Sequence, residues 1–229
     1  MTKNRSKRYK KLKELSKSVK IQTIDEAIKL VKNNCTTKFN ESIDVSFKLN
    51  LKQKKDEATL RAAINLPNGN GKKIKIAVLC EENKHKEAKD AGADFYESES
   101  LINDINSGKI NFDKLVATPS MMSRMSKLGK ILGPKGLMPN PKLGTVTNNI
   151  SSAVKLIKSG QVEIKNDKDG NLGLSIGKKS FADNKIKENF NALIQTVNKE
   201  KPIGIKGDFV LSAYLTSTMG VSYKLKLEK

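Results

Sequence analysis

The spacing of the apolar residues changes twice along this chain, and this change limits the fold more than any other feature. Apolar and polar residues alternate in residues 43–51 and 60–66, which predicts two half-buried strands. Between residues 74 and 160 short apolar runs alternate with helical patterns, as in a parallel sheet covered by helices. From Gln161 onward the alternating pattern returns. The sequence therefore predicts one structural unit that is interrupted by another.

A split α+β domain with an inserted α/β (Rossmann-like) domain is the simplest fold for this pattern. We expect residues 1–67 plus 160–229 to form the split domain and residues 68–159 to form the inserted domain. Both crossings between the domains contain glycine, so we expect a double hinge there. One continuous domain with a mixed sheet is the alternative that the pattern leaves open.

Three amphipathic helices are predicted in the split domain. Residues 6–19 have a narrow apolar stripe beneath many lysines. Thr23 and Glu26 form a capping box at the start of the second helix, and residues 183–198 form the third.

Two hairpins are predicted in the second half of the chain. The first is expected to turn at Gly170 and to pair residues 162–164 with residues 172–176. The second turns through TSTMG, residues 216–220. Its hydroxyl groups can bond to ribose 2′-OH groups and phosphates, so this loop is a candidate RNA contact. A plain hairpin turn is the alternative.

The charge of the chain indicates the chemistry of its partner. Lysine and arginine number 44 against 24 aspartates and glutamates, a formal net charge of +20. This excess favours nucleic acid over an acidic membrane or a merely solvated basic surface. Aromatic residues make up 5% of the chain, which argues against a platform of several stacking rings and for recognition of folded RNA. No segment reaches the roughly 20 apolar residues that span a bilayer, so we expect no membrane contact and a location that is cytoplasmic, or organellar after import.

Catalytic and metal-binding motifs are missing from the sequence. GLSIGKKS has three rather than four residues between its glycines, so it is not a Walker loop. Cys35 and Cys80 lack the close spacing of a zinc site, and we expect both to be reduced and half-buried. His85 is the only histidine and is expected at the surface. We therefore expect a non-enzymatic protein without a cofactor or metal.

Residues 114–162 contain several lysines and no aspartate or glutamate. At the centre of this tract lies KLGKILGPKGLMPNPKLGTV, residues 127–146. A tract of one charge sign can follow a phosphate backbone. Alternatively, its glycines and prolines only provide the backbone dihedral angles that a compact loop needs. Composition leaves both alternatives open.

Lys38 and Phe39 lie in the segment TKFNES, ahead of the first alternating strand. A loop aromatic beside a lysine packs on a ribose or base while the lysine meets phosphate. Alternatively, Phe39 closes the core of the sheet, and the sequence does not decide between these.

Several segments carry a resemblance to a known family. In chain order they are SKRYKKL, TIDEAIKLVK, TKFNES, AGAD, LVATPSMM, SKLGKILGPKGLMPNPKLGTV, KPIGIKGDF and TSTMG. Over nearly the whole chain the sequence resembles the bacterial ribosomal protein L1 family of the large subunit's mobile stalk. The resemblance implies a discontinuous first domain with a second domain inserted, and it implies no cofactor and no catalysis.

The same resemblance implies a function in translation. It implies binding to large-subunit ribosomal RNA at the stalk beside the tRNA exit site, where stalk movement assists release of deacylated tRNA. Many family members also repress translation of their own messenger RNA. The implied partners are therefore large-subunit ribosomal RNA, tRNA at the exit site and the chain's own messenger RNA. A free RNA-binding translational repressor is the alternative function.

The resemblance also implies which residues contact RNA, and most of them lie in the split domain. TSTMG differs from the TTTMG common in the family only at Ser217, which keeps the hydroxyl, whereas Val221 replaces a small residue or proline. The implied RNA-binding residues are Lys7, Arg8, Lys38, Phe39, Ser42, Lys168, Ser212, Ser217, Thr218, Met219 and Gly220.

Overall fold

The chain forms two compact units. The first combines Met1–Gly71 with Val162–Lys229, and the second is Lys72–Gln161. Both contain helices and strands, so the predicted mixture of α and β structure is confirmed. No helix among the described residues is long and apolar enough to cross a membrane. The computed structural model describes residues 6–17, 21–51, 60–202, 205 and 207–227.

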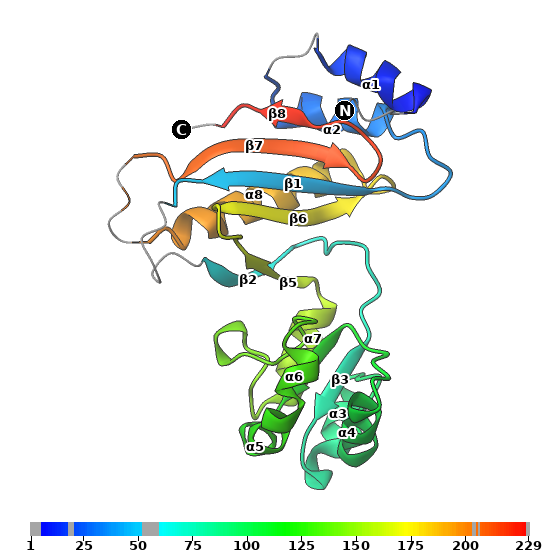
Figure 1. Cartoon of the computed structure of the whole chain (residues 1–229), viewed down its shortest axis with the longest axis vertical. Helices are drawn as coiled ribbons and strands as arrows, with labels where there is room; N and C mark the ends of the chain where they lie inside the picture. Colours follow the sequence, from blue (N-terminus) through cyan, green and yellow to red (C-terminus); the bar gives the residue numbers. More distant parts are fainter. Residues whose placement is uncertain (1–5, 18–20, 52–59, 203–204, 206, 228–229) are drawn as a thin grey trace. The chain divides into compact units, whose positions relative to one another are not determined.

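An antiparallel sheet of four strands is the framework of the first unit, in the order β6-β1-β7-β8 (Figure 1). The central strand β1 pairs with both β6 and β7. As predicted from their alternation, Ile43, Val45, Phe47 and Leu49 of β1 are all buried. The strands are β1 Ser42–Leu49, β6 Asn171–Lys178, β7 Val210–Ser217 and β8 Tyr223–Leu225.

Helices α2 and α8 pack on this sheet and share one hydrophobic core with it. Figure 1 shows α8 behind β1 and β6. The predicted capping box of α2 is confirmed, because the Thr23 hydroxyl accepts the Glu26 N–H and the Glu26 carboxylate accepts the Thr23 N–H. The last predicted residues of the first helix, 18–19, lie outside the described residues. The helices are α1 Lys7–Lys17, α2 Ile24–Asn33 and α8 Asp183–Lys199.

One predicted strand pairing is wrong. β5, Gln161–Lys165, pairs with β2, Arg61–Asn65, in a separate two-stranded sheet, whereas β6 pairs with β1. An ion pair of 2.7 Å between Arg61 and Glu163 joins β2 to β5. The alternating pattern correctly predicted that these residues form strands. It did not predict the partner, because alternation marks the buried face of a strand and not its neighbour.

The second unit is built around two parallel strands, β3 and β4, as its short apolar runs predicted. Helices α3 and α7 pack on one face of this pair, and α4, α5 and α6 pack on the other. The strands are β3 Ile76–Leu79 and β4 Lys114–Ala117. The helices are α3 His85–Asp90, α4 Ser98–Asn106, α5 Met122–Met125, α6 Gly129–Leu132 and α7 Ile150–Lys158, with 3-10 turns η1 Glu82–Lys84, η2 Pro119–Met121, η3 Ser126–Leu128 and η4 Pro141–Leu143.

The glycine- and proline-rich stretch of residues 127–146 contains α6 and η4, joined and followed by tight turns. Gly136 and Gly144 have φ values of 68° and 70°, a left-handed conformation that glycine adopts without strain. The Asn140 side chain accepts the Lys142 N–H at 2.9 Å and so caps η4. These glycines therefore serve the turns of this stretch.

The two cysteines are free and buried rather than half-buried as we expected. Burial raises the pKa of both the Cys35 and the Cys80 thiol. Both thiols are therefore neutral at physiological pH, which suits packing rather than reactivity.

Candidate nucleic-acid interface

Most of the predicted RNA-binding residues lie at one end of the four-stranded sheet, where β1 begins and β7 ends. Ile43 of β1 pairs with Ser217 of β7. Just beyond this pair, the Ser42 N–H donates to the Thr218 hydroxyl at 3.0 Å, and the Thr218 N–H donates to the Ser42 carbonyl at 3.1 Å. Thr218 therefore fixes the loop after β7 to the start of β1 with both its backbone and its side chain.

Glu41 links two loops at this end of the sheet. Its side chain is fully buried, and its carboxylate accepts the Thr37 hydroxyl at 2.8 Å and the Met219 N–H at 3.0 Å. Burial by itself would raise the pKa of Glu41, but these hydrogen bonds and the nearby Ser217 hydroxyl outweigh burial and lower the pKa. Glu41 therefore stays ionised at neutral pH and holds the loop of Phe39 against the loop of Met219.

Arg8 of α1 binds to the same loop. Its guanidinium donates to the Met219 carbonyl at 2.7 Å and to the Thr36 hydroxyl at 3.3 Å. A guanidinium has five N–H donors, so these two bonds leave others for a phosphate. Lys7 beside it is exposed. Arg8 therefore positions the Met219 loop in addition to supplying charge.

Two large apolar side chains are exposed at this end of the sheet. Phe39 is 52% exposed and Met219 is 48% exposed. The alternative in which Phe39 closes the core is therefore wrong. Lys38 next to Phe39 is exposed as well. An exposed ring beside a cation suits contacts to a ribose or base and its phosphate.

Gly220 lies in the turn that follows β7. Its N–H donates to the Ser217 carbonyl at 3.1 Å. A Cβ at this position would lie 2.4 Å from the Ser217 hydroxyl oxygen, and Ser217 is buried. The fold thus explains this glycine, and a close approach of RNA to Gly220 stays a prediction.

Ser212 and Lys168 lie toward the opposite end of the sheet. Lys48, near the end of β1, pairs with Ser212 on one side and with Asn171 on the other, and Lys168 is exposed in the turn just before Asn171. The strand from Ser42 to Lys48 spans about 20 Å. The predicted residues therefore form two groups, one at each end of β1.

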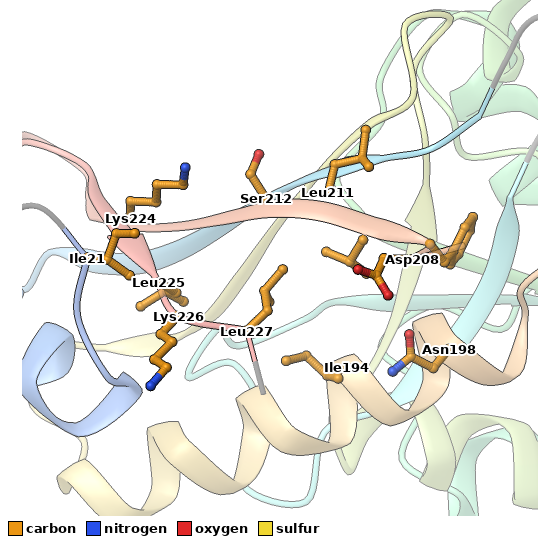
Figure 2. A pocket seen from close by; sticks show the side chains of 12 residues that line it. Ile21, Ile194, Asn198, Asp208, Leu211, Ser212, Lys224, Leu225, Lys226 and Leu227 are labelled. Carbon is orange, nitrogen blue, oxygen red and sulfur yellow. The ribbon is translucent and has the colours of Figure 1, made fainter. Parts of the chain in front are cut away.

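Ser212 also borders a pocket of about 470 Å³ that β7, β8 and α8 enclose (Figure 2). Leu211, Leu225 and Leu227 contribute apolar surface to it. Figure 2 shows Ser212 on the side of β7 away from α8. Its hydroxyl therefore faces the open side of the sheet.

Comparison with known proteins identifies the family of this chain. Residues 31–221 match the model of the ribosomal protein L1p/L10e family. The chain belongs to this family. A protein of Pelagibacter ubique named large ribosomal subunit protein uL1 is 56% identical over 225 residues, which cover 98% of each chain. Proteins of the same name from Kosmotoga olearia and Rickettsia typhi are 47% and 44% identical, over 98% and 97% of this chain and 97% and 94% of theirs.

Membership of the L1p/L10e family confirms two of the sequence-based predictions. The resemblance to ribosomal protein L1 is confirmed over nearly the whole chain. The family consists of structural proteins without catalytic activity, so the prediction of a non-enzymatic chain is confirmed through the family.

The family's sequence segments did not point to several residues that the structure brings to this site. Lys178, at the end of β6, donates to the Ser42 hydroxyl at 2.9 Å. The Asn40 side chain donates to the Ser180 hydroxyl at 2.9 Å and accepts the Ser180 N–H at 3.2 Å. Lys178 and Ser180 are distant from Ser42 in sequence, and only the pairing of β6 with β1 brings them there. Glu41 could have been found from the sequence, because it is the acidic residue within the segment TKFNES.

Proposed function

We propose that the chain is a structural constituent of the large ribosomal subunit and binds large-subunit ribosomal RNA through its first unit. The observation that carries this proposal is the exposure of Phe39 and Met219 around the buried carboxylate of Glu41. The cluster offers apolar surface, hydroxyl groups and positive charge on a fixed frame, which suits a folded RNA. The names of the relatives, proteins of the large ribosomal subunit, support assembly in that particle.

The electrostatics of this cluster support RNA as its partner. Glu41 is its buried acid, and hydrogen bonds from neighbouring residues satisfy its charge. Lys38 and Arg8 therefore dominate the field outside the cluster, and the whole chain adds a net charge of +20. Such a field attracts a phosphate backbone and orients it before close contacts form.

We further propose a place and two roles for the chain within translation. It lies at the mobile stalk beside the tRNA exit site, where stalk movement assists release of deacylated tRNA. It also represses translation of its own messenger RNA, because one RNA-binding surface serves both RNAs where the messenger folds similarly. These roles locate the protein on the ribosome in the cytoplasm.

A division of labour between the two units is part of this proposal. We assign RNA binding to residues 1–67 plus 160–229, and we assign residues 68–159 to an inserted domain joined by a double hinge. The compact units have their borders at Gly71 and Val162, within a few residues of these limits, and this supports the assignment.

Footprinting on ribosomal RNA tests the proposal. RNA extracted from the large subunit of Pelagibacter ubique is a suitable probe, because the protein of that organism is 56% identical to this chain. We expect the full-length chain to protect one compact region from nuclease and to bind it more tightly than an unrelated structured RNA of equal length. Equal affinity for both RNAs would contradict specific binding.

Sedimentation distinguishes this function from that of a free repressor. A ribosomal constituent should co-sediment with large subunits at moderate salt, because its contacts are specific. A chain that leaves the subunits under these conditions but still binds its own messenger would favour the alternative.

A further inference from the structure

A row of exposed residues crosses all four strands on the face of the sheet away from α8. Gly173 of β6 pairs with Ser46 of β1, Ser46 pairs with Tyr214 of β7, and Tyr214 pairs with Lys224 of β8. All four residues are exposed, and their strand neighbours on β1, β7 and β8 are buried. Figure 2 shows Lys224 on the same side of the sheet as Ser212, away from α8.

Tyr214 stands in this row between small residues and a cation. Its side chain is 36% exposed. Ser46 and Gly173 rise little above the sheet, so they leave the flank of the ring toward β6 uncovered. A lone exposed tyrosine in a strand needs no special explanation, because aromatic residues favour strands. Gly173, which lies in the same row, is the reason to expect a ligand at this ring.

Gly173 has no structural explanation among the described residues. Its backbone is not in the left-handed region, and a Cβ added there would meet nothing within 4 Å. The glycines beside it differ: Gly170 has a φ of 75°, and a Cβ at Gly177 would lie 3.1 Å from the Phe181 ring. Glycine weakens a strand, and it occurs where another group comes close to the backbone. Gly173 therefore indicates a partner that approaches β6 on its open face.

The charge of this face matches a phosphate. Lys48, Lys178 and Lys224 lie on its strands at positions that alternate with buried residues, together with one acid, Asp44. The row also lies between the two groups of predicted RNA-binding residues, because Ser46 lies between Ser42 and Lys48 on β1, two residues from Lys48. An RNA that contacts both groups must cross the row.

We propose that Gly173, Ser46, Tyr214 and Lys224 hold one unpaired nucleotide of the bound RNA. Its base stacks on the flank of the Tyr214 ring toward β6, over Ser46 and the bare backbone at Gly173, and its sugar and phosphate extend past the ring toward Lys224. The inference rests on the proposed RNA-binding function and extends it from the end of the sheet to its open face. A nucleotide fits better than a peptide strand, because a strand adds to the edge of a sheet and not to its face.

Substitutions at Tyr214 and Gly173 test this proposal with the ribosomal RNA of Pelagibacter ubique as the probe. Tyr214→Ala should lower the affinity about 10-fold or more, whereas Tyr214→Phe keeps the ring and should stay within about two-fold of wild type. Gly173→Val should lower the affinity by a similar factor while it raises the thermal midpoint, because valine favours strands and has room there. A purely structural glycine would not move stability and affinity in opposite directions.

A fluorescent reporter tests the stacking directly. The chain contains no tryptophan, so Tyr214→Trp introduces a single one. Stacking of a base on this indole should quench its fluorescence when RNA binds. Phe95→Trp is the matched control, because Phe95 is equally 36% exposed but lies in the second unit, and its fluorescence should not change.

The outcomes separate this inference from the function on which it rests. The nucleotide site is overturned if both Tyr214→Ala and Gly173→Val bind RNA with full affinity. It is also overturned if Tyr214→Trp binds RNA without quenching. Either result leaves the proposed function intact. Failure of the wild-type chain to bind the RNA overturns both. Quenching by an extended peptide but not by RNA would assign the face to a protein partner and overturn the inference.

Discussion

Single residues at the end of the sheet build the fold and also belong to the RNA surface that we propose. The Thr218 hydroxyl accepts the Ser42 N–H, the Glu41 carboxylate accepts the Met219 N–H, and the guanidinium of Arg8 binds the Met219 carbonyl. These three hydrogen bonds hold the loop that carries the exposed Met219 side chain. The entropic cost of ordering that loop is therefore met during folding rather than during binding.

Replacing Thr218 by valine should weaken both the fold and RNA binding. The change keeps the volume but leaves the Ser42 N–H without its acceptor, so we expect a loss of about 1 kcal/mol in the free energy of unfolding. We expect RNA affinity to fall by roughly 1–3 kcal/mol, because Thr218 is one of the predicted RNA-binding residues and its hydroxyl also fixes the loop to β1. Urea unfolding and filter binding measure the two effects.

The control for this change is Thr196→Val on α8. It removes a hydroxyl that donates to the Ala192 carbonyl at 2.9 Å, away from the sheet end. RNA affinity should stay unchanged in this control. An unaltered affinity of a folded Thr218→Val variant would show that Thr218 does not contribute to the RNA surface.

Glu41→Gln should destabilise the protein in a pH-dependent way. The amide keeps the shape but presents one donor to groups that are themselves donors, so we expect a loss of about 1–3 kcal/mol at neutral pH. The folded pKa of Glu41 is lowered, so its stabilising contribution is complete above the unfolded pKa of about 4.3 and is lost as the pH falls through the folded pKa. The stability difference between wild type and variant should therefore shrink below about pH 4. Urea unfolding from pH 7 to pH 3 checks this, and a constant difference would contradict it.

At the scale of elements, the sequence predicts helices and strands from the regular spacing of apolar residues. It does not predict which strands pair, because pairing depends on neighbours in space. α2, α8 and β1 follow from apolar residues at helical or alternating spacing, and the structure has them where predicted. The pairing of β5 with β2 does not follow, because β5 alternates equally well beside any partner. The same reason hides Lys178 from a sequence-based search, since it reaches Ser42 only through the pairing of β6 with β1.

Thr23→Ala should destabilise the first unit through the start of α2. The change removes the acceptor of the Glu26 N–H and with it one half of the capping box. The expected loss is about 1 kcal/mol in the free energy of unfolding. Thermal or urea unfolding measures it, and Thr23→Ser, which keeps the hydroxyl, is the control. Equal losses in the two variants would mean that the hydroxyl does not cap the helix.

At the scale of the molecule, the four-stranded sheet and its core lie entirely within the first unit. Replacing residues 72–161 by a short glycine-serine linker should therefore leave this unit folded. The specific footprint on ribosomal RNA should persist, whereas the non-specific attraction should fall, because the acid-free lysines of residues 114–158 are lost. Footprinting and the salt dependence of binding measure the two effects. A folded deletion variant without a footprint would assign the specific contact to the second unit.

The central position of β1 also determines when the proposed RNA surface can form in a living cell. β1 is synthesised early, but both its neighbours, β6 and β7, follow the second unit in the chain. At typical translation rates the nascent β1 waits on the order of ten seconds for β7, and both of its edges stay unpaired until β6 has been made. The second unit is continuous in sequence and can fold during this delay. We therefore expect the proposed RNA surface to form on a nascent chain only after β7 has been translated.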